Sequence, residues 1–565
     1  MLPSVGWSQL QNDLLLFLPE AVVCCAIVAL LLIRLVAAFD RTHLGLISLV
    51  AVVTACIVAF LGDSAGAVTF GGLLVGDPFT RFARLLILGT SALTILLSLL
   101  TGIPDREDSG DFYVLLLGGT LGMLFMASAN HLLMAYIAVE MASLPSYALA
   151  GFLKGKRQGS EAALKYVVYG GGASGVMLYG ISLIAGKFGT GYLPDLAKGY
   201  EAVLTQQSTS GVPDAVLVLG TLLILVGLSF KLSVVPFHFW CPDVFEGAAA
   251  EVAAFLSVAS KAGAFALTGR LLLALASPAG ADGGYLLARY FGAPLAGFAM
   301  LTATFGNLAA YAQTNMKRLL AYSTIAHAGY MLAGVATLTP EGAQSVLFYL
   351  ATYAFMNMGA FAVVAFVRNK TGSEDITAYR GLIYRSPGVV VVMGIFLLSL
   401  LGLPPLAGFV AKFQVFAAIF HAGQSASASP TPWLGTVYYT LLVVVGINTV
   451  FSAVYYLRVL KTMIFDKPLE AVEGQPVPAL TIPVSSTAYA GLLAIAVFVL
   501  GVIVDPVTAA SRESVQPFRK REAIVVTPPA KAKGKGRGDG PAKGQNKGGP
   551  AKGQLKAPAK SKEGN

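Results

Sequence analysis

The feature that most constrains this chain is a lysine followed by a helix break inside an apolar run of membrane-spanning length. The run covers about residues 215–243 and ends in the segment FKLSVVPFHFWCPD. Lys231 lies within it, and Pro236 has no backbone N–H with which to continue a helix. A lysine in hydrocarbon costs about 2.5–3.5 kcal/mol on insertion scales, and a broken helix at that depth must face protein or a wet cavity. We therefore expect Lys231, the break and His238 to line an ion path.

Apolar runs of this length recur along the whole chain. Of its 565 residues, 56% are hydrophobic and only 12% are charged, and the mean hydropathy is +0.72. Because a spanning helix needs about 20 apolar residues, the sequence predicts an all-α, polytopic membrane protein, and no strand pattern of alternating polarity competes. The 14 expected spans are 14–38, 43–62, 79–101, 112–128, 130–153, 163–186, 214–239, 248–275, 285–312, 317–338, 343–368, 387–420, 436–465 and 482–504.

The net charge of +10 comes from the C-terminal tail. Residues 511–565 hold 14 Lys/Arg and 4 Asp/Glu, and the rest of the chain holds 25 of each sign. Gly, Pro, Ala and Lys dominate residues 527–565, a composition that predicts disorder. A basic tail of this kind suits anionic lipid or an acidic partner, and we expect no nucleic acid partner.

The short loops predict the orientation in the membrane. Lys and Arg are more frequent in the loops that follow odd-numbered spans, so the positive-inside rule places the N-terminus outside. With 14 spans the basic tail would also lie outside, and an error of one span would move it inside.

Ionisable residues inside the expected spans are few. Besides Lys231 and His238, the candidates for an ion path are Glu140, Lys165, Lys261, His327 and Lys412, together with Glu161 just before the span of Lys165. Lys412 follows a second break, at Pro404 and Pro405. Lys165 comes four residues after Glu161 on the same helix face and is close enough to a helix end to reach the headgroups. Each charged residue has a structural alternative as a buried ion-pair partner, and each histidine as a satisfied core residue.

These residues suggest how protons would move. Desolvation disfavours the charged form of a buried lysine, and a nearby carboxylate favours it. Moving Glu140 toward or away from Lys231 would therefore bind or release a proton. A chain of Lys231, Lys261, His327 and Lys412 with intervening waters would carry protons across the centre of the bilayer.

The sequence predicts no cofactor or metal site on this chain. Its four cysteines show no CxxC spacing. GGGASG at residues 170–175 matches G-x-G-x-x-G, but it lies inside a spanning run and follows no strand, so close helix packing explains it better.

The motifs in combination resemble one family. In order, they are residues 129–131 (ANH), 139–145 (VEMASLP), 231–243, 259–261 (ASK), 313–323 (QTNMKRLLAYS) and 402–412 (GLPPLAGFVAK). Over about residues 10–505 the chain is similar to the antiporter-like membrane subunits of the proton-pumping NADH–quinone oxidoreductase (bacterial complex I). Lysine at position 412 favours the subunit N branch of that family.

The resemblance implies an organisation for the whole chain. It implies two inverted five-helix repeats, each with one broken helix. The expected parts are N-terminal helices in 1–111, repeats in 112–275 and 285–465, a C-terminal helix in 482–504 and the basic tail in 511–565.

The resemblance also implies roles and partners. Glu140 and Lys231 would be the coupling pair, Lys261 the central relay and Lys412 the lysine on the exit side. FMN, iron–sulfur clusters and quinone would belong to partner subunits, so NADH and quinone would act only through the assembly. The expected location is the inner (cytoplasmic) membrane.

Two departures and two alternatives stay open at this point. The family usually has proline where this chain has Ala249 and Glu251, and the basic tail lies outside the family pattern. A subunit of a sodium–proton antiporter without redox coupling shares the fold and the helix motifs. A scaffold subunit that conducts nothing is the other alternative.

Overall fold

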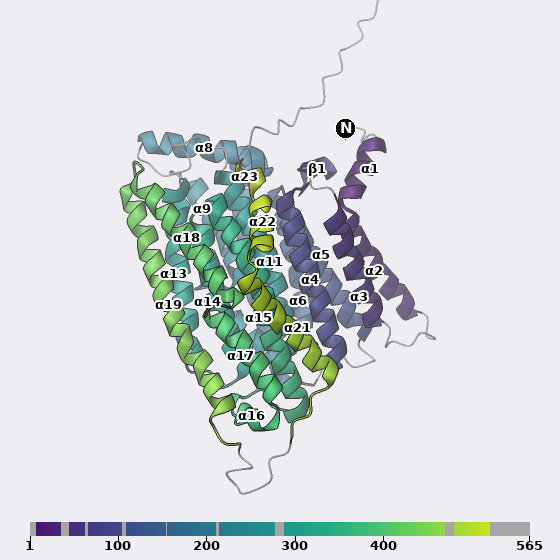
Figure 1. The fold of residues 1–565 in the computed structure, drawn as a ribbon. Coiled ribbons are helices and arrows are strands. Elements are labelled where there is room, and N and C mark those ends of the chain that lie inside the picture. The colour runs from purple at the N-terminus through teal and green to yellow at the C-terminus, as the bar shows by residue number, and fades with distance from the viewer. Residues whose placement is uncertain are drawn as a thin grey trace, which may run out of the picture. The chain divides into compact units, whose positions relative to one another are not determined.

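The computed structural model describes residues 7–35, 44–62, 66–103, 109–153, 155–210, 214–276, 287–468 and 479–519. Most of these residues are helical, and the long helices lie side by side (Figure 1). The described residues all belong to one compact unit, Met1–Arg521. The prediction of a helical membrane protein is confirmed. The expected disorder of residues 527–565 lies outside the described residues.

The helices follow the chain in three groups. The first group is α1 (Trp7–Leu16), α2 (Leu18–Leu35), α3 (Leu44–Leu61) and α4 (Pro78–Thr101). The second is α5 (Ser109–Ser128), α6 (Leu132–Ala150), α7 (Arg157–Phe188), α8 (Leu193–Ser210), α9 (Ala215–Leu232), α10 (Trp240–Gly247) and α11 (Ala250–Ala276). The third is η3 (Ala288–Gly292), α13 (Ala293–Ala310), α14 (Met316–Ala336), α15 (Pro340–Thr371), η4 (Ile376–Tyr379), α16 (Leu382–Arg385), α17 (Pro387–Leu401), α18 (Ala407–Ser427), α19 (Pro432–Ile464), α21 (Val484–Val502), α22 (Asp505–Ser514) and α23 (Gln516–Arg519).

The described helices do not confirm the expected count of 14 spans. In the described part of the chain, 12 helices are long and apolar enough to cross a membrane. The count rises to 13 if Leu10–Leu16 and Leu18–Ile33, which meet at 76°, form one bent span. The expected span 387–420 is divided between α17, a shorter apolar helix, and α18 beyond the second break. The count of 14 and the inverted repeat stay predictions.

Two short strands have no counterpart in the sequence prediction. Strands β1 (Ala67–Thr69) and β2 (Leu74–Gly76) form an antiparallel hairpin. Next to it, Ala129 pairs with Leu74, and His131 pairs with Tyr192. These bridges hold 129–131 extended and so separate α5 from α6, two spans with only these three residues between them.

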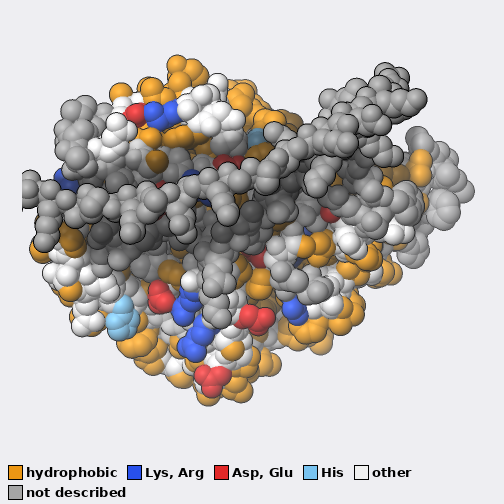
Figure 2. Space-filling model, turned by 90° about the horizontal axis from the view of Figure 1, so that it is seen from above, with side chains coloured by type: hydrophobic (Ala, Val, Ile, Leu, Met, Phe, Trp, Pro, Cys, Tyr) orange, Lys and Arg blue, Asp and Glu red, His pale blue; other side chains and the backbone are white. Residues whose placement is uncertain are grey.

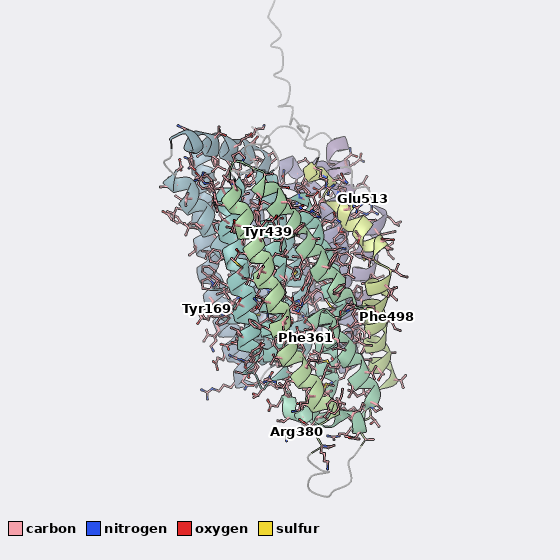
Figure 3. The ribbon with its side chains drawn as sticks, turned by 60° about the vertical axis from the view of Figure 1, so that its left-hand side comes forward. Tyr169, Phe361, Arg380, Tyr439, Phe498 and Glu513 are labelled. Carbon is pink, nitrogen blue, oxygen red and sulfur yellow. The ribbon has the colours of Figure 1, made fainter. Side chains whose placement is uncertain are left out.

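Three helices form the buried centre of the bundle. Every residue of α11 from Ala250 to Leu275 is buried, and α14 and α15 are buried over most of their length. A helix that is apolar on all sides has no face for solvent or headgroups. Figure 3 shows the contrast: Tyr169 and Phe498 lie at the edges of the bundle, each 50% exposed, whereas Phe361 on α15 is fully buried.

The outer faces of the bundle are apolar. Large exposed side chains on α3, α7, α19 and α21 are mainly Leu, Val, Ile and Phe. Seen from above in Figure 2, apolar side chains surround much of this end, and charged side chains lie scattered among them. The apolar outer faces of these helices are what contact with lipid requires.

A buried ion pair joins α4 to α11. The guanidinium of Arg270 donates to both carboxylate oxygens of Asp77, at 2.9 and 2.7 Å, and its Nε donates to the carbonyl of Ala127 at 2.9 Å. Asp77 also caps α4 by accepting from the Thr80 N–H at 2.8 Å. Burial raises the pKa of Asp77, but Arg270 and Thr80 outweigh it and leave that pKa below its usual value.

The last described segment packs back on the bundle. Residues 511–519, which the sequence assigned to the tail, are helical in α22 and α23. Phe518 contacts the ring of Phe79 edge-on at 5.5 Å, and Arg519 pairs with Glu341 at 2.6 Å. The packed part of the chain therefore extends at least to residue 519.

Candidate functional site

The first break begins at the end of α9. Ser233 adopts the left-handed conformation (φ 59°), which turns the chain away from the helix axis. The N–H groups of Ser233 and Val234 donate back to the carbonyls of Phe230 and Ser229, at 3.0 and 2.9 Å. Pro236 follows, after a cis peptide bond. The sequence prediction of a helix break here is confirmed.

The second break has the same construction at the end of α17. Gly402 is left-handed (φ 93°), and the N–H groups of Gly402 and Leu403 donate to the carbonyl of Leu398 at 3.0 and 3.1 Å. The peptide bond between Pro404 and Pro405 is cis. Glycine suits position 402, since any other residue would be strained at this φ and its Cβ would lie 3.0 Å from the Cδ of Lys412. This break, too, is confirmed.

At each break a buried lysine holds the last carbonyl of the preceding half-helix. Lys261 on α11 donates from Nζ to the carbonyl of Leu232 at 2.7 Å. Lys412 on α18 donates to the carbonyl of Leu401 at 2.8 Å. The C-terminal end of a helix carries a partial negative charge, so both ammonium groups lie where a cation is favoured. Both lysines are at most 3% exposed.

Lys231 is buried without such a partner. It is 2% exposed, and its Nζ makes no hydrogen bond to the residues that the structure describes. The ammonium lies 5.9 Å from the centre of the Tyr166 ring, which stacks on Trp240 at 4.3 Å. Glu140 is the carboxylate whose field acts on Lys231, while its own Oε1 accepts from the Ser174 hydroxyl. The two expected partners therefore do not form a close ion pair, and their coupling stays a prediction.

Lys165 has a structural partner set. It pairs with Glu161 at 2.8 Å and with Asp243 at 2.7 Å, and Arg318 reaches the other oxygen of Asp243 at 2.7 Å. Burial raises the pKa of Asp243, but its hydrogen bonds to Lys165 and Arg318 outweigh burial and lower that pKa. This network of ion pairs fixes α10 between α7 and α14 and gives Lys165 and Glu161 a structural role. Their role in a proton relay stays a prediction.

His327 is held by tyrosines that the sequence analysis did not single out. Its Nδ1 lies 2.7 Å from the hydroxyl of Tyr349, and its Nε2 lies 3.2 Å from that of Tyr456. The Tyr456 hydroxyl in turn lies 2.5 Å from the hydroxyl of Ser323. His327 therefore has a hydrogen-bonding group on both sides of its ring, as a proton relay needs.

A second polar group, around Asn307, lies closer to Lys412. Asn307 donates to the hydroxyl of Tyr330 at 3.2 Å and accepts from Tyr455 at 3.0 Å. The Tyr330 ring lies 4.8 Å from the Nζ of Lys412. The available signal in the sequence was a set of tyrosine hydroxyls inside apolar runs, which need partners when buried.

His238 is separated from this network. It is 3% exposed, its ring packs against Phe239 and Phe305 at 4.5 and 4.4 Å, and its Nδ1 has no hydrogen-bond partner among the described residues. Its surroundings are those of an aromatic core residue.

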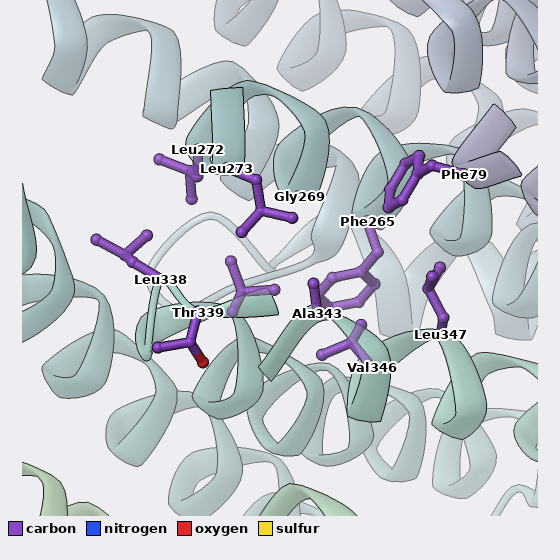
Figure 4. Close-up of a pocket in the computed structure, with 11 residues that line it drawn as sticks. Phe79, Phe265, Gly269, Leu272, Leu273, Leu338, Thr339, Ala343, Val346 and Leu347 are labelled. Atoms are coloured by element: carbon purple, nitrogen blue, oxygen red, sulfur yellow. The ribbon is translucent and has the colours of Figure 1, made fainter. Parts of the chain in front are cut away.

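One cavity of the bundle is apolar, and none of the buried lysines or histidines lines it. Figure 4 shows it between α4, α11, α14 and α15, with about 340 Å³ of empty space, part of it open to solvent. The hydroxyl of Thr339 is the one polar side-chain group in its lining. Among the described residues, no three His, Cys, Asp or Glu side chains are placed to share a metal ion.

Comparisons with known proteins agree with one another. The family model described as "NADH:quinone oxidoreductase/Mrp antiporter, TM" matches residues 129–430. The chain is 40% identical to NADH-quinone oxidoreductase subunit N of Anaeromyxobacter sp. (strain Fw109-5) over 517 residues, which cover 89% of this chain and 96% of that protein.

Solved structures show the same fold. A chain of respiratory complex I from Thermus thermophilus is 31% identical, with a TM-score of 0.69 over 88% of this chain and 99% of that chain. A chain of the Mrp complex from Dietzia sp. DQ12-45-1b has a TM-score of 0.73 over 89% of this chain and 97% of that chain, at 21% identity. The second likeness shows the fold alone.

Proposed function

The chain belongs to the antiporter-like membrane subunits, the family that includes subunit N of NADH-quinone oxidoreductase, and on that premise we propose that it translocates protons within such an oxidoreductase. The observation that carries the proposal is the placement of the buried lysines. Lys261 and Lys412 each meet the open carbonyl end of a broken helix, and Lys231 is buried beside the first break without a hydrogen-bond partner among the described residues. Charges so placed inside a membrane protein suit an ion path better than a purely structural role.

The proposed mechanism assigns one role to each group. The field of Glu140 tunes Lys231, and a shift in their separation binds or releases a proton there. Lys261 relays protons at the centre, and Lys412 passes them to the exit side. His327, with its tyrosine partners, would pass protons toward Lys412 through water, since its ring lies 5.8 Å from the Tyr330 ring, which in turn contacts Lys412.

Electron transfer belongs to other parts of the assembly. The proteins that this chain resembles come from multi-subunit membrane complexes, so other membrane subunits are its partners. FMN, iron–sulfur clusters, quinone and NADH would all be bound by partner subunits, and the assembly would lie in the inner membrane. Iron or flavin in stoichiometric amounts on the purified chain would contradict this assignment.

The organisation into repeats is part of the same proposal. Both breaks begin with a left-handed residue, and at both a lysine donates to the last carbonyl of the preceding helix, which supports one repeat around α5–α11 and another around α13–α19. The sodium–proton antiporter alternative has weaker support, because the relative at 40% identity is an oxidoreductase subunit and the Mrp likeness is one of fold.

The test is Lys231→Arg in membrane vesicles. Arginine keeps the positive charge but does not release a proton in this range, and moving one proton against 100 mV requires about 2.3 kcal/mol. The variant is expected to assemble and to lose NADH-driven proton pumping. Lys187→Arg is the matched control, because Lys187 is partly exposed and paired with Asp214 at 2.6 Å. Full pumping by Lys231→Arg would make Lys231 a fixed charge.

A further inference from the structure

Glu251, at the start of α11, is a buried carboxylate that the proposed mechanism does not use. It stands where the family usually has proline, and it is 0% exposed. Both of its carboxylate oxygens are buried without a hydrogen-bond partner among the described residues. A buried carboxylate in this condition needs a compensating proton, cation or water.

The charged groups around Glu251 come from two neighbouring elements. On α15, Nη2 of Arg368 lies 3.9 Å from its Oε1, beyond hydrogen-bond distance, and also donates to Asn369 at 2.9 Å. On α14, Lys317 interacts with Glu251 electrostatically, but its ammonium is bound closely by Glu374 at 2.8 Å. Of the two acids in this cluster, Glu374 has a tight partner and Glu251 has a loose one.

The cluster also connects Glu251 to the first break. The Nζ of Lys317 donates to the carbonyl of Ala248 at 2.6 Å, in the junction between α10 and α11. Glu251 follows that junction by three residues. A change of charge on Glu251 would therefore act on Lys317, which holds the carbonyl of Ala248 at the end of α10.

Exposure to water differs among these residues. The side chain of Glu374 is 17% exposed and that of Arg368 is 10% exposed, whereas that of Glu251 is fully buried. Exposure thus falls along the cluster from its surface to the first turn of α11. Two residues of this cluster, Lys317 and Arg368, border loops that follow odd-numbered expected spans, the loops that the positive-inside rule places on the inner side.

We propose that Glu251 is a proton-uptake site of this subunit. Its carboxylate accepts a proton from water that reaches it past Glu374 and Arg368, and the resulting carboxylic acid later releases that proton to water deeper in the bundle. Arg368 loses only its loose contact in the process and keeps Asn369, while the close pair of Lys317 and Glu374 stays intact. The proposal rests on the proposed proton-translocating function.

The next polar groups inward lie along α11. Ser257, one turn before Lys261, accepts from Asn357 of α15 at 2.6 Å, and Oδ1 of Asn357 is buried without a partner among the described residues. Ten residues separate Glu251 from Lys261, about 15 Å along a helix. A proton would therefore need water to travel between them, and Oδ1 of Asn357 offers an acceptor for it.

The experiment compares Glu251→Gln with wild type in the assembled complex. Glutamine keeps the shape of the side chain and cannot bind a proton. Glu341→Gln is the matched control, because Glu341 is 52% exposed and paired with Arg519. The first measurement is NADH-driven pumping per assembled complex as a function of pH. The second is the infrared C=O band of a protonated carboxyl group, recorded as a difference spectrum against pH.

The proposal expects Glu251→Gln to lose pumping progressively as the pH rises, because the uptake site matters most when protons are scarce, and to lose one carboxyl band. Glu341→Gln is expected to match wild type in both. Wild-type pumping by Glu251→Gln over the whole pH range would overturn the proposal. So would a pH-independent loss that Glu251→Asp shares, which would make Glu251 a fixed counter-ion.

The infrared band separates this proposal from the function on which it rests. If Lys231→Arg pumps normally while the band of Glu251 is present, the lysine mechanism fails and proton exchange at Glu251 stands. If Lys231→Arg fails to pump and Glu251→Gln changes neither the band nor pumping, the lysine mechanism stands and the uptake site is wrong.

Discussion

Replacement of Lys412 can distinguish a charge that caps a helix from a group that carries a proton. The ammonium donates to the Leu401 carbonyl at 2.8 Å and lies 4.8 Å from the Tyr330 ring centre. A hydrogen bond to a charged group contributes about 1.5–3 kcal/mol, and a desolvated cation–π contact contributes up to about 2 kcal/mol. Lys412→Met loses both and leaves a buried carbonyl at the end of α17 unpaired.

Lys412→Arg retains what the cap needs. A guanidinium is also a charged donor and stacks well on an aromatic ring, but it does not give up a proton in this range. We expect Lys412→Met to lower both the thermal stability of the solubilised complex and its pumping. Lys412→Arg is expected to stay near wild type in stability and to lose pumping.

The assay measures proton uptake by inverted membrane vesicles with a pH-sensitive dye, together with NADH oxidation and the amount of assembled subunit. Lys187→Arg is again the control for a lysine-to-arginine change at an ion-paired site. Wild-type pumping by Lys412→Arg would refute the reasoning, because it would show that a non-titrating charge is sufficient at this break. Loss of stability in both variants to the same extent would refute the capping argument.

Three further predictions concern other parts of the chain. Asp77→Asn leaves Arg270 buried without its carboxylate and should cost about 3–5 kcal/mol, read as a lower melting temperature with pumping per assembled complex retained; an unchanged melting temperature would contradict it. Because the pKa of Asp77 lies below its usual value, this stabilisation should be complete above about pH 4 and should decline as the pH falls through the lowered value. Tyr349→Phe removes the hydroxyl at 2.7 Å from the buried histidine of α14 and should reduce pumping, whereas Tyr179→Phe on the exposed face of α7 should not; equal pumping by the two variants would exclude the tyrosine from the path. Removal of residues 520–565 should leave assembly and pumping unchanged, and loss of pumping at normal subunit levels would show that the tail takes part.

The sequence predicted the helices and the breaks because both depend on local chemistry. Each expected span corresponds to one helix or to a pair of helices, since hydropathy reports directly on the cost of exposing the backbone to lipid. Prolines identified both breaks, since a missing N–H acts at its own position. The left-handed Ser233 was not predictable in this way, because serine rarely adopts that conformation and the surrounding fold imposes it here.

The partners of the buried charges depended on tertiary structure. The spacing of Lys165 and Glu161 indicated one ion pair, which forms at 2.8 Å. The second partner of Lys165 is Asp243 from a distant segment, and Lys261 donates to a backbone carbonyl. Neither partner could be found by spacing along one helix. The tyrosines that hydrogen-bond to His327 were missed for the same reason, because α15 and α19 contribute them from parts of the chain separate from α14.

The contacts of Lys261 and Lys412 explain why lysine suits a broken helix that must also conduct protons. An open carbonyl at membrane depth needs a donor at all times, and a charged lysine has three N–H donors. After releasing a proton, a lysine amine still has two, so the carbonyls of Leu232 and Leu401 can stay hydrogen-bonded in both protonation states. The charge at the end of the half-helix changes by one unit, while its hydrogen bond persists. A proton can therefore pass each break without the break having to refold. The charged lysine is attracted to the helix end and the neutral lysine is not. Releasing the proton loses this attraction, and a moving carboxylate has to balance that loss.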